Sequence, residues 1–273
     1  MDFQLDEGLA EYGLNICRAK YVEIRLERRI RNDIMLVNGV MRDNNVTENL
    51  GFSIRVVDGG MGFYFSNIVS KEEIKKGVER AEKMARIGSK KVGMSEGRME
   101  EGKYGIKARE AGMDEKMEYL HTMDAEVSDH SRIFSYTDEV VEKLYVNSEG
   151  SKIKSLIPRT YLYYLLTVSE EGKTEQMNRE FGNAGGWDAV KEWKVEEFLR
   201  HDAGFLSDLI KHGEKPPERG DVIMGPQITG LIAHESCGHP FEADRILGRE
   251  AAQAGKSYAS PTLLGEEFAS ECV

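Results

Sequence analysis

The feature that most restricts the fold is an alternation of apolar and charged residues near the N-terminus. In YVEIRLERRI, residues 21–30, every second side chain from Val22 to Leu26 is apolar, and the residues between them are charged. A period of two is typical of a β-strand with one face on a core and the other in water. GFSIRVVDGGMGFYFSN, residues 51–67, has two further strand-like runs around a glycine-rich turn, which predicts a β-hairpin.

Four other segments have the residue spacing of helices. Apolar periodicity predicts helices over Glu7–Arg18, Asp114–Val127 and Lys194–Lys211. Another helix should begin after Ser70, because Ser70 and Glu73 form a capping box before a run of apolar residues three and four apart. Helices combined with antiparallel strands define an α+β protein, and we expect the helices to pack on antiparallel sheets.

The middle of the chain should contribute more antiparallel sheet. Residues 132–168 contain three strand-like segments, separated by NSEG at 147–150 and by Pro158. Residues 88–112 are rich in Gly, Lys and Glu and poor in large apolar residues, which predicts a surface loop or connector.

The pair Pro216-Pro217 is the best candidate for a boundary between domains. We therefore expect an N-terminal α+β domain over residues 1–215 and the beginning of a second, β-rich domain over residues 219–273. This second domain should open with a short strand at DVIM, residues 221–224, and continue into a helix that carries a candidate metal site.

Composition excludes several classes of function. The net charge is −11 and there is no Lys/Arg stripe interleaved with aromatic residues, which argues against nucleic-acid binding. There is no apolar run of about eighteen residues, so we expect no membrane span. The first residues lack the pattern of a signal peptide, and the three widely spaced cysteines do not form a disulfide framework. A cytoplasmic protein with free thiols is the expectation.

The candidate metal site is HESCGH, residues 234–239, in which two histidines are five residues apart. Residues four apart share one face of a regular α-helix, whereas residues five apart diverge by about 140° around the axis. His234 and His239 therefore cannot meet at one ion on a regular helix. Gly238 offers a solution, because a glycine can end the helix with a positive φ or accommodate a widened turn that brings His239 back.

The stretch GLIAHESCGHPFEADRILG, residues 230–248, resembles the signature of the TldD/PmbA peptidase family. The hairpin at 51–67 and the order of the elements are similar to that family more loosely. The resemblance implies that His234 and His239 bind zinc and that Glu235 acts as the general base. It also implies a cysteine far along the C-terminal half as a further ligand, and pairs of subunits in which only the catalytic one carries the motif. This chain resembles the catalytic subunit.

The chemistry of these residue types agrees with those roles. Neutral imidazoles are good zinc ligands, and zinc makes hydroxide available at neutral pH. Glu235 stands beside a ligand, where it can accept a proton from water. Glu242 and Asp244 are candidates for carboxylates that orient the histidines, with simple salt bridging as the alternative.

The chain departs from the family pattern in one respect: it ends at residue 273, where the family continues with a long β-rich half. The family's cysteine ligand is missing, and neither Cys237 nor Cys272 is a good substitute. We expect a truncated chain with an incomplete zinc site. Two functions remain: a zinc-dependent peptidase acting on peptides or unfolded polypeptides, with a family partner in a homo- or hetero-oligomer, or a noncatalytic binding or assembly subunit.

Overall fold

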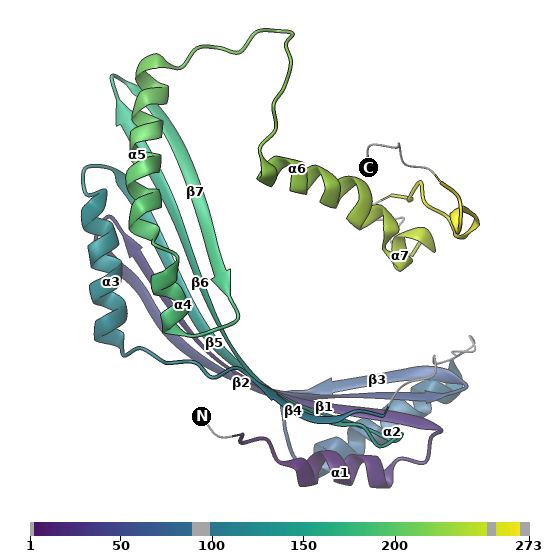
Figure 1. Cartoon of the computed structure of the whole chain (residues 1–273). Helices are drawn as coiled ribbons and strands as arrows, with labels where there is room; N and C mark the ends of the chain where they lie inside the picture. The colour runs from purple at the N-terminus through teal and green to yellow at the C-terminus, as the bar shows by residue number, and fades with distance from the viewer. Residues whose placement is uncertain (1–2, 89–98, 250–254, 268–273) are drawn as a thin grey trace. The chain divides into compact units, whose positions relative to one another are not determined.

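The computed structural model describes residues 3–88, 99–249 and 255–267. The chain divides into two compact units, Met1–Gly213 and Glu214–Val273, which are described separately below. The first unit contains a long β-sheet with helices (Figure 1), and the second consists of short helical turns and loops among its described residues.

The sheet of the first unit is almost entirely antiparallel. Its strands are β1 (Tyr21–Val37), β2 (Val40–Asp58), β3 (Gly60–Ser66), β4 (Glu101–Gly105), β5 (Ser131–Asn147), β6 (Lys152–Glu170) and β7 (Lys173–Asn183). The strand order is β3-β2-β1-β5-β6, and both β4 and β7 pair with β6. Only the short β4 runs parallel to its neighbour.

Helices pack on one face of this sheet and form two separate cores. The helices are α1 (Glu7–Ile16), α2 (Lys71–Ile87), α3 (Met113–Glu126), α4 (Trp187–Glu192) and α5 (Val195–His212). Helices α1 and α2 cover one end of the sheet around Ile24, and α3 to α5 cover the other end around Ile34 (Figure 1). Because Ile24 and Ile34 are an even number of residues apart on β1, both cores lie on the same face.

The local signals in the sequence account for several elements. Gly59 adopts a φ of +84° between β2 and β3, as the hairpin prediction requires. The backbone N–H of Glu73 donates to the Ser70 side chain at 3.2 Å and caps α2. The carboxylate of Glu73 does not complete the box, since it accepts from the Tyr64 hydroxyl and from Lys76. The predicted α+β class, with helices on antiparallel sheet, is confirmed.

The prediction of three strands over residues 132–168 is wrong, because Pro158 lies inside β6 and does not end it. In addition to its pairing with β5, β6 pairs with β4 through residues 152–156 and with β7 through residues 160–170. Pro158 therefore occupies a short stretch where β6 has β5 as its only described neighbour. Proline lacks an N–H and is tolerated where one side of a strand is open.

The predicted connector at 88–112 also needs correction. Residues 101–105 form strand β4 on the edge of β6, and the backbone N–H of Ile106 extends that pairing to the Leu156 carbonyl. The pattern of this segment is too polar to signal a strand, and its pairing depends on the exposed edge of β6. Residues 89–98 lie outside the described residues.

The second unit contains α6 (Pro226–Ala233), a π-helical turn (His234–Gly238), a 3₁₀ turn (His239–Phe241), α7 (Ala243–Ile246) and a second 3₁₀ turn (Pro261–Leu263). The expected strand at 221–224 is not formed, and no strand occurs among the described residues of this unit. A strand needs a partner for its backbone groups, and these residues have none among the described part of the chain. The expected helix leading into His234 is present as α6.

Candidate metal centre

The two motif histidines meet because the helix widens by one residue at this point. Helix α6 starts with Pro226, whose fixed φ suits the first turn, and runs without a break into the π-helical turn His234–Gly238. The backbone N–H of His239 donates to the carbonyl of His234, five residues earlier. Gly238 has a φ of −64°, so the widened turn is the solution that the chain adopts, and not a positive φ.

The imidazole rings of His234 and His239 face each other closely. Their Nε2 atoms are 2.9 Å apart, and the rings are nearly perpendicular. At this distance the two nitrogens are within hydrogen-bonding reach of each other, and the tautomers of the rings decide which one donates. Both Nε2 atoms are thus directed at the same point in space.

Glu242 determines how His239 is oriented. Its Oε1 atom is 2.8 Å from Nδ1 of His239, and the carboxylate also forms an ion pair with Arg245 at 3.6 Å. A carboxylate on Nδ1 keeps the proton there and leaves the lone pair of Nε2 free. Asp244 instead accepts from the backbone N–H of Arg245, and it contacts neither histidine. Of the two carboxylates proposed from the sequence, Glu242 is therefore the one at a histidine.

The carboxylate of Glu235 completes a group of metal-ligating atoms. One atom each from His234, Glu235 and His239 lie within 4.8 Å of one another. Cys237 has an exposed thiol and does not belong to this group. Arg245 was not among the residues predicted for the site, although its spacing of three residues from Glu242 on a helical turn indicates the pair.

Zinc fits this donor set. Two nitrogen ligands of a tetrahedral zinc lie about 3.3 Å apart at the usual Zn–N distances of about 2.0–2.1 Å. The observed Nε2–Nε2 distance of 2.9 Å requires only a small rotation of the rings. Imidazole nitrogens are among the usual ligands of zinc, and the Glu235 carboxylate lies near them.

Comparison with known proteins identifies the family. The model of the PmbA/TldA metallopeptidase domain 1 matches residues 22–85, and that of the PmbA/TldA metallopeptidase central domain matches residues 106–210. Together they cover more than half of the chain. The chain belongs to the TldD/PmbA metallopeptidase family. Both hydrophobic cores contain residues from both matched ranges, because the long strands β1 and β5 run through both cores.

Individual relatives agree with this membership. A metalloprotease of Methanocaldococcus jannaschii is 29% identical over 93% of this chain and 57% of its own length. A protein of Saccharolobus solfataricus named zinc metalloprotease TldD homolog is 24% identical over 84% of this chain and 52% of its own. The chain thus spans little more than half the length of these relatives.

A solved structure shares the fold. TldE from Thermococcus kodakarensis superimposes with a TM-score of 0.57 at 16% identity, over 72% of this chain and 47% of TldE. Among the described residues no helix is long and apolar enough to cross a membrane. The cytoplasmic location expected from the sequence stays a prediction.

Proposed function

We propose that the protein is a zinc-dependent peptidase acting on peptides or unfolded polypeptides, with His234 and His239 as ligands and Glu235 as the general base. The observation that supports this function is the meeting of both Nε2 atoms and the Glu235 carboxylate in one group of donors. The names of the relatives agree, since they are called metalloproteases and one is named for zinc.

Each residue has a role that follows from its place. When bound, zinc supplies Lewis-acid chemistry that activates water at neutral pH. His234 and His239 would hold it through Nε2, and Glu242 keeps the Nδ1 proton of His239 in place. Glu235 accepts a proton from the attacking water and passes it to the leaving amine.

The site is incomplete within this chain. Catalytic zinc usually has three protein ligands, and this proposal assigns only two, His234 and His239. We therefore propose that the 273-residue chain holds zinc weakly and does not hydrolyse peptides by itself. The working protein would be a homo- or hetero-oligomer with a partner subunit of the family.

Calorimetric titration of the chain with zinc at pH 7 tests the incomplete site. We expect binding weaker than micromolar, and we expect Cys237→Ser to leave it unchanged. Submicromolar, stoichiometric binding that disappears in Cys237→Ser would contradict the proposal, because it would identify Cys237 as the missing ligand.

The role of Glu235 is tested in the longest natural form of the protein, by peptide cleavage and zinc content. Glu235→Gln should lower turnover by at least about 100-fold, because a general base is lost, and should leave zinc bound. Glu218→Gln, at an exposed glutamate outside the site, is the matched control. Wild-type turnover in Glu235→Gln would exclude the general-base role. Absence of cleavage in the wild type, with zinc bound, would favour a noncatalytic subunit.

A further inference from the structure

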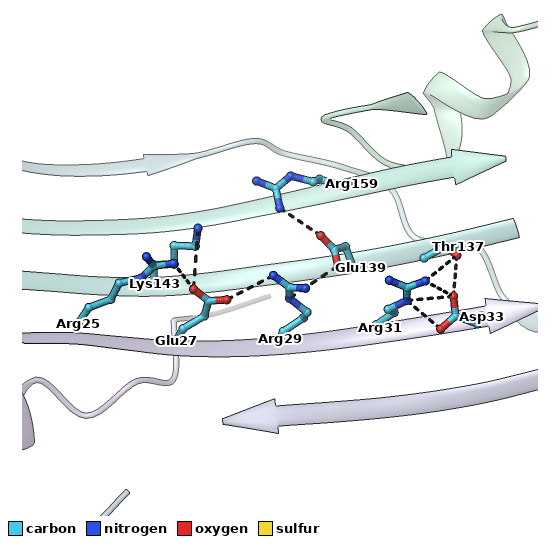
Figure 2. A network of polar contacts seen from close by, with 9 residues as sticks. All are labelled: Arg25, Glu27, Arg29, Arg31, Asp33, Thr137, Glu139, Lys143 and Arg159. Atoms are coloured by element: carbon cyan, nitrogen blue, oxygen red, sulfur yellow. Dashed lines mark hydrogen bonds and ion pairs between the residues drawn. The ribbon is translucent and has the colours of Figure 1, made fainter. Parts of the chain in front are cut away.

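The face of the sheet opposite the helices carries a connected group of charged side chains (Figure 2). On β1 the even-numbered residues Ile24 and Ile34 point into the two cores, so the odd-numbered residues point to the opposite face. We call this surface the charged face and define it by Arg25, Glu27, Arg29, Glu139, Lys143 and Arg159. These residues come from β1, β5 and β6.

Within the charged face, each carboxylate is shared among several cations. Glu27 forms ion pairs with Arg25, with Arg29 at 3.4 Å and with Lys143 at 3.9 Å. Glu139 forms ion pairs with Arg159 at 3.1 Å and with Arg29 at 3.7 Å. Four cations therefore share two carboxylates, which leaves a net charge of +2 on this surface in a chain whose net charge is −11.

The neighbouring ion pair of Arg31 and Asp33 has equal numbers of positive and negative charges. Arg31 forms two-pronged hydrogen bonds of 2.8 to 2.9 Å with Asp33, and Asp33 also accepts from the Thr137 hydroxyl. The guanidinium lowers the pKa of Asp33 and the carboxylate raises the pKa of Arg31. This pair is neutral as a whole, so it adds nothing to the net charge of +2 on the charged face.

Three of the cations, Arg25, Arg29 and Arg159, line two open hollows; Arg29 lines both, and Glu27 also lines the first. One, of about 510 Å³, is lined by Arg25, Arg29, the side-chain-free Gly51 and the exposed ring of Phe65. The other, of about 750 Å³, is lined by Arg29 and Arg159 beside Glu139. A guanidinium has five N–H donors, and the carboxylates of this face use only some of them.

The cations follow the repeat of an extended chain. Arg25 and Arg29 lie on β1. Lys143 lies on β5, opposite Glu27 of β1. Arg159 lies on β6, opposite Glu139 of β5, and Glu139 lies opposite Arg31 of β1. A cation of the charged face thus lies at, or in register with, each of the β1 positions 25, 27, 29 and 31, over about 20 Å along the strands. A peptide in β conformation has the same rise per residue and directs every second side chain to one side.

We propose that the charged face binds an extended peptide segment with carboxylates at alternate positions, lying over β1, β5 and β6. Arginine suits this ligand because its planar fork matches a carboxylate with two parallel hydrogen bonds. The spacing of the cations at every second residue along the strands matches the repeat of a β-strand, which favours a peptide over a nucleic acid. Binding at this surface is independent of peptide hydrolysis.

Fluorescence anisotropy with the full 273-residue chain in the presence of EDTA tests this inference. The probe is a labelled twelve-residue peptide with Glu and Ser alternating. One matched peptide has Gln in place of Glu, and another has the same six Glu residues in one block. We expect the alternating Glu peptide to bind at 50 mM salt and at least about fivefold more weakly at 300 mM, because exposed charges are screened. Both matched peptides should bind at least about fivefold more weakly than the probe.

Variants assign the binding to the charged face. Arg29→Gln and Arg159→Gln should each weaken binding at least fivefold, and Arg29→Lys should weaken it less, because it keeps the charge but loses the fork. Arg200→Gln is the matched control, since Arg200 on α5 is also exposed and pairs with one carboxylate, Glu126. Circular dichroism confirms that each variant is folded.

Three outcomes would overturn the inference. The first is equal binding of the Gln peptide or the block peptide, which would remove the requirement for spaced carboxylates. The second is an equal loss of affinity in Arg200→Gln and Arg159→Gln. The third is tighter binding of a single-stranded oligonucleotide of the same charge. Because EDTA removes zinc, none of these outcomes depends on the proposed peptidase activity.

Discussion

At the scale of single residues, the hydrogen bond between Glu242 and His239 is the contact that most affects the candidate metal centre. The 2.8 Å contact keeps the Nδ1 proton of His239 and so leaves Nε2 free to bind a metal. We predict that Glu242→Gln lowers zinc affinity by about 10- to 100-fold, as loss of such a partner commonly does. Competition with a chromogenic chelator, on the longest natural form of the protein, measures this change. Asp244→Asn is the matched control and should have no effect, and an equal loss in both variants would contradict the assignment.

At the scale of elements, the attachment of α5 to the sheet depends on Asp202. This side chain is fully buried, accepts two hydrogen bonds of 2.6 Å from Arg179 on β7, and accepts a third from the Tyr164 hydroxyl on β6. Asp202→Ala would leave a guanidinium and a hydroxyl without their partner, so we predict a loss of about 3–5 kcal/mol of unfolding free energy. Urea titration of Asp202→Ala and of the exposed control Asp208→Ala tests this, and a loss below about 1 kcal/mol in Asp202→Ala would refute it.

A second group of contacts ties α3 to α4 and makes stability depend on pH. Glu115 accepts from Arg109, Lys191 and the Trp187 indole, and Arg109 with these partners lowers the pKa of Glu115 from its ordinary value of 4.5 to about 2. A lowered folded-state pKa contributes stability that is fully present above pH 4.5 and is lost as pH falls toward 2.

We therefore predict that Glu115→Gln is less stable than the wild type at pH 7 and that the difference disappears between pH 4.5 and pH 2. Thermal unfolding followed by circular dichroism across this range measures the effect. Glu118→Gln, at an exposed position of the same helix, should show no such pH dependence. A difference between Glu115→Gln and wild type that persists at pH 2 would argue against the ionised network.

At the scale of the whole molecule, both hydrophobic cores lie within Met1–Gly213 and share the long strands β1 and β5. We predict that a fragment of residues 1–213 folds by itself. Its unfolding temperature should equal that of the first unit in the full chain. Residues 1–130, which lack β5 and therefore the strand that both cores use, should not fold. Calorimetry of the two fragments checks this, and an unfolded 1–213 fragment would show that the second unit is required.

The features that could be read from the sequence are those governed by neighbouring residues. Alternation predicts β1, a glycine with positive φ permits the hairpin at Gly59, and a serine caps α2 at Ser70. The five-residue spacing of His234 and His239 likewise requires a local departure from α-helical geometry, which the π-helical turn provides. Each of these depends on interactions within a few residues, so each leaves a pattern in the chain.

Contacts between distant segments were decided only by the tertiary structure. Pro158 is accommodated because β4 and β7 pair with β6 on either side of it, and the polar residues 101–105 become a strand only because that edge is open. The excess charge of the charged face likewise depends on Arg159 reaching Glu139 from another strand. The composition of each segment is compatible with several partners, and the energy that selects one comes from pairing and burial with residues far away in the chain.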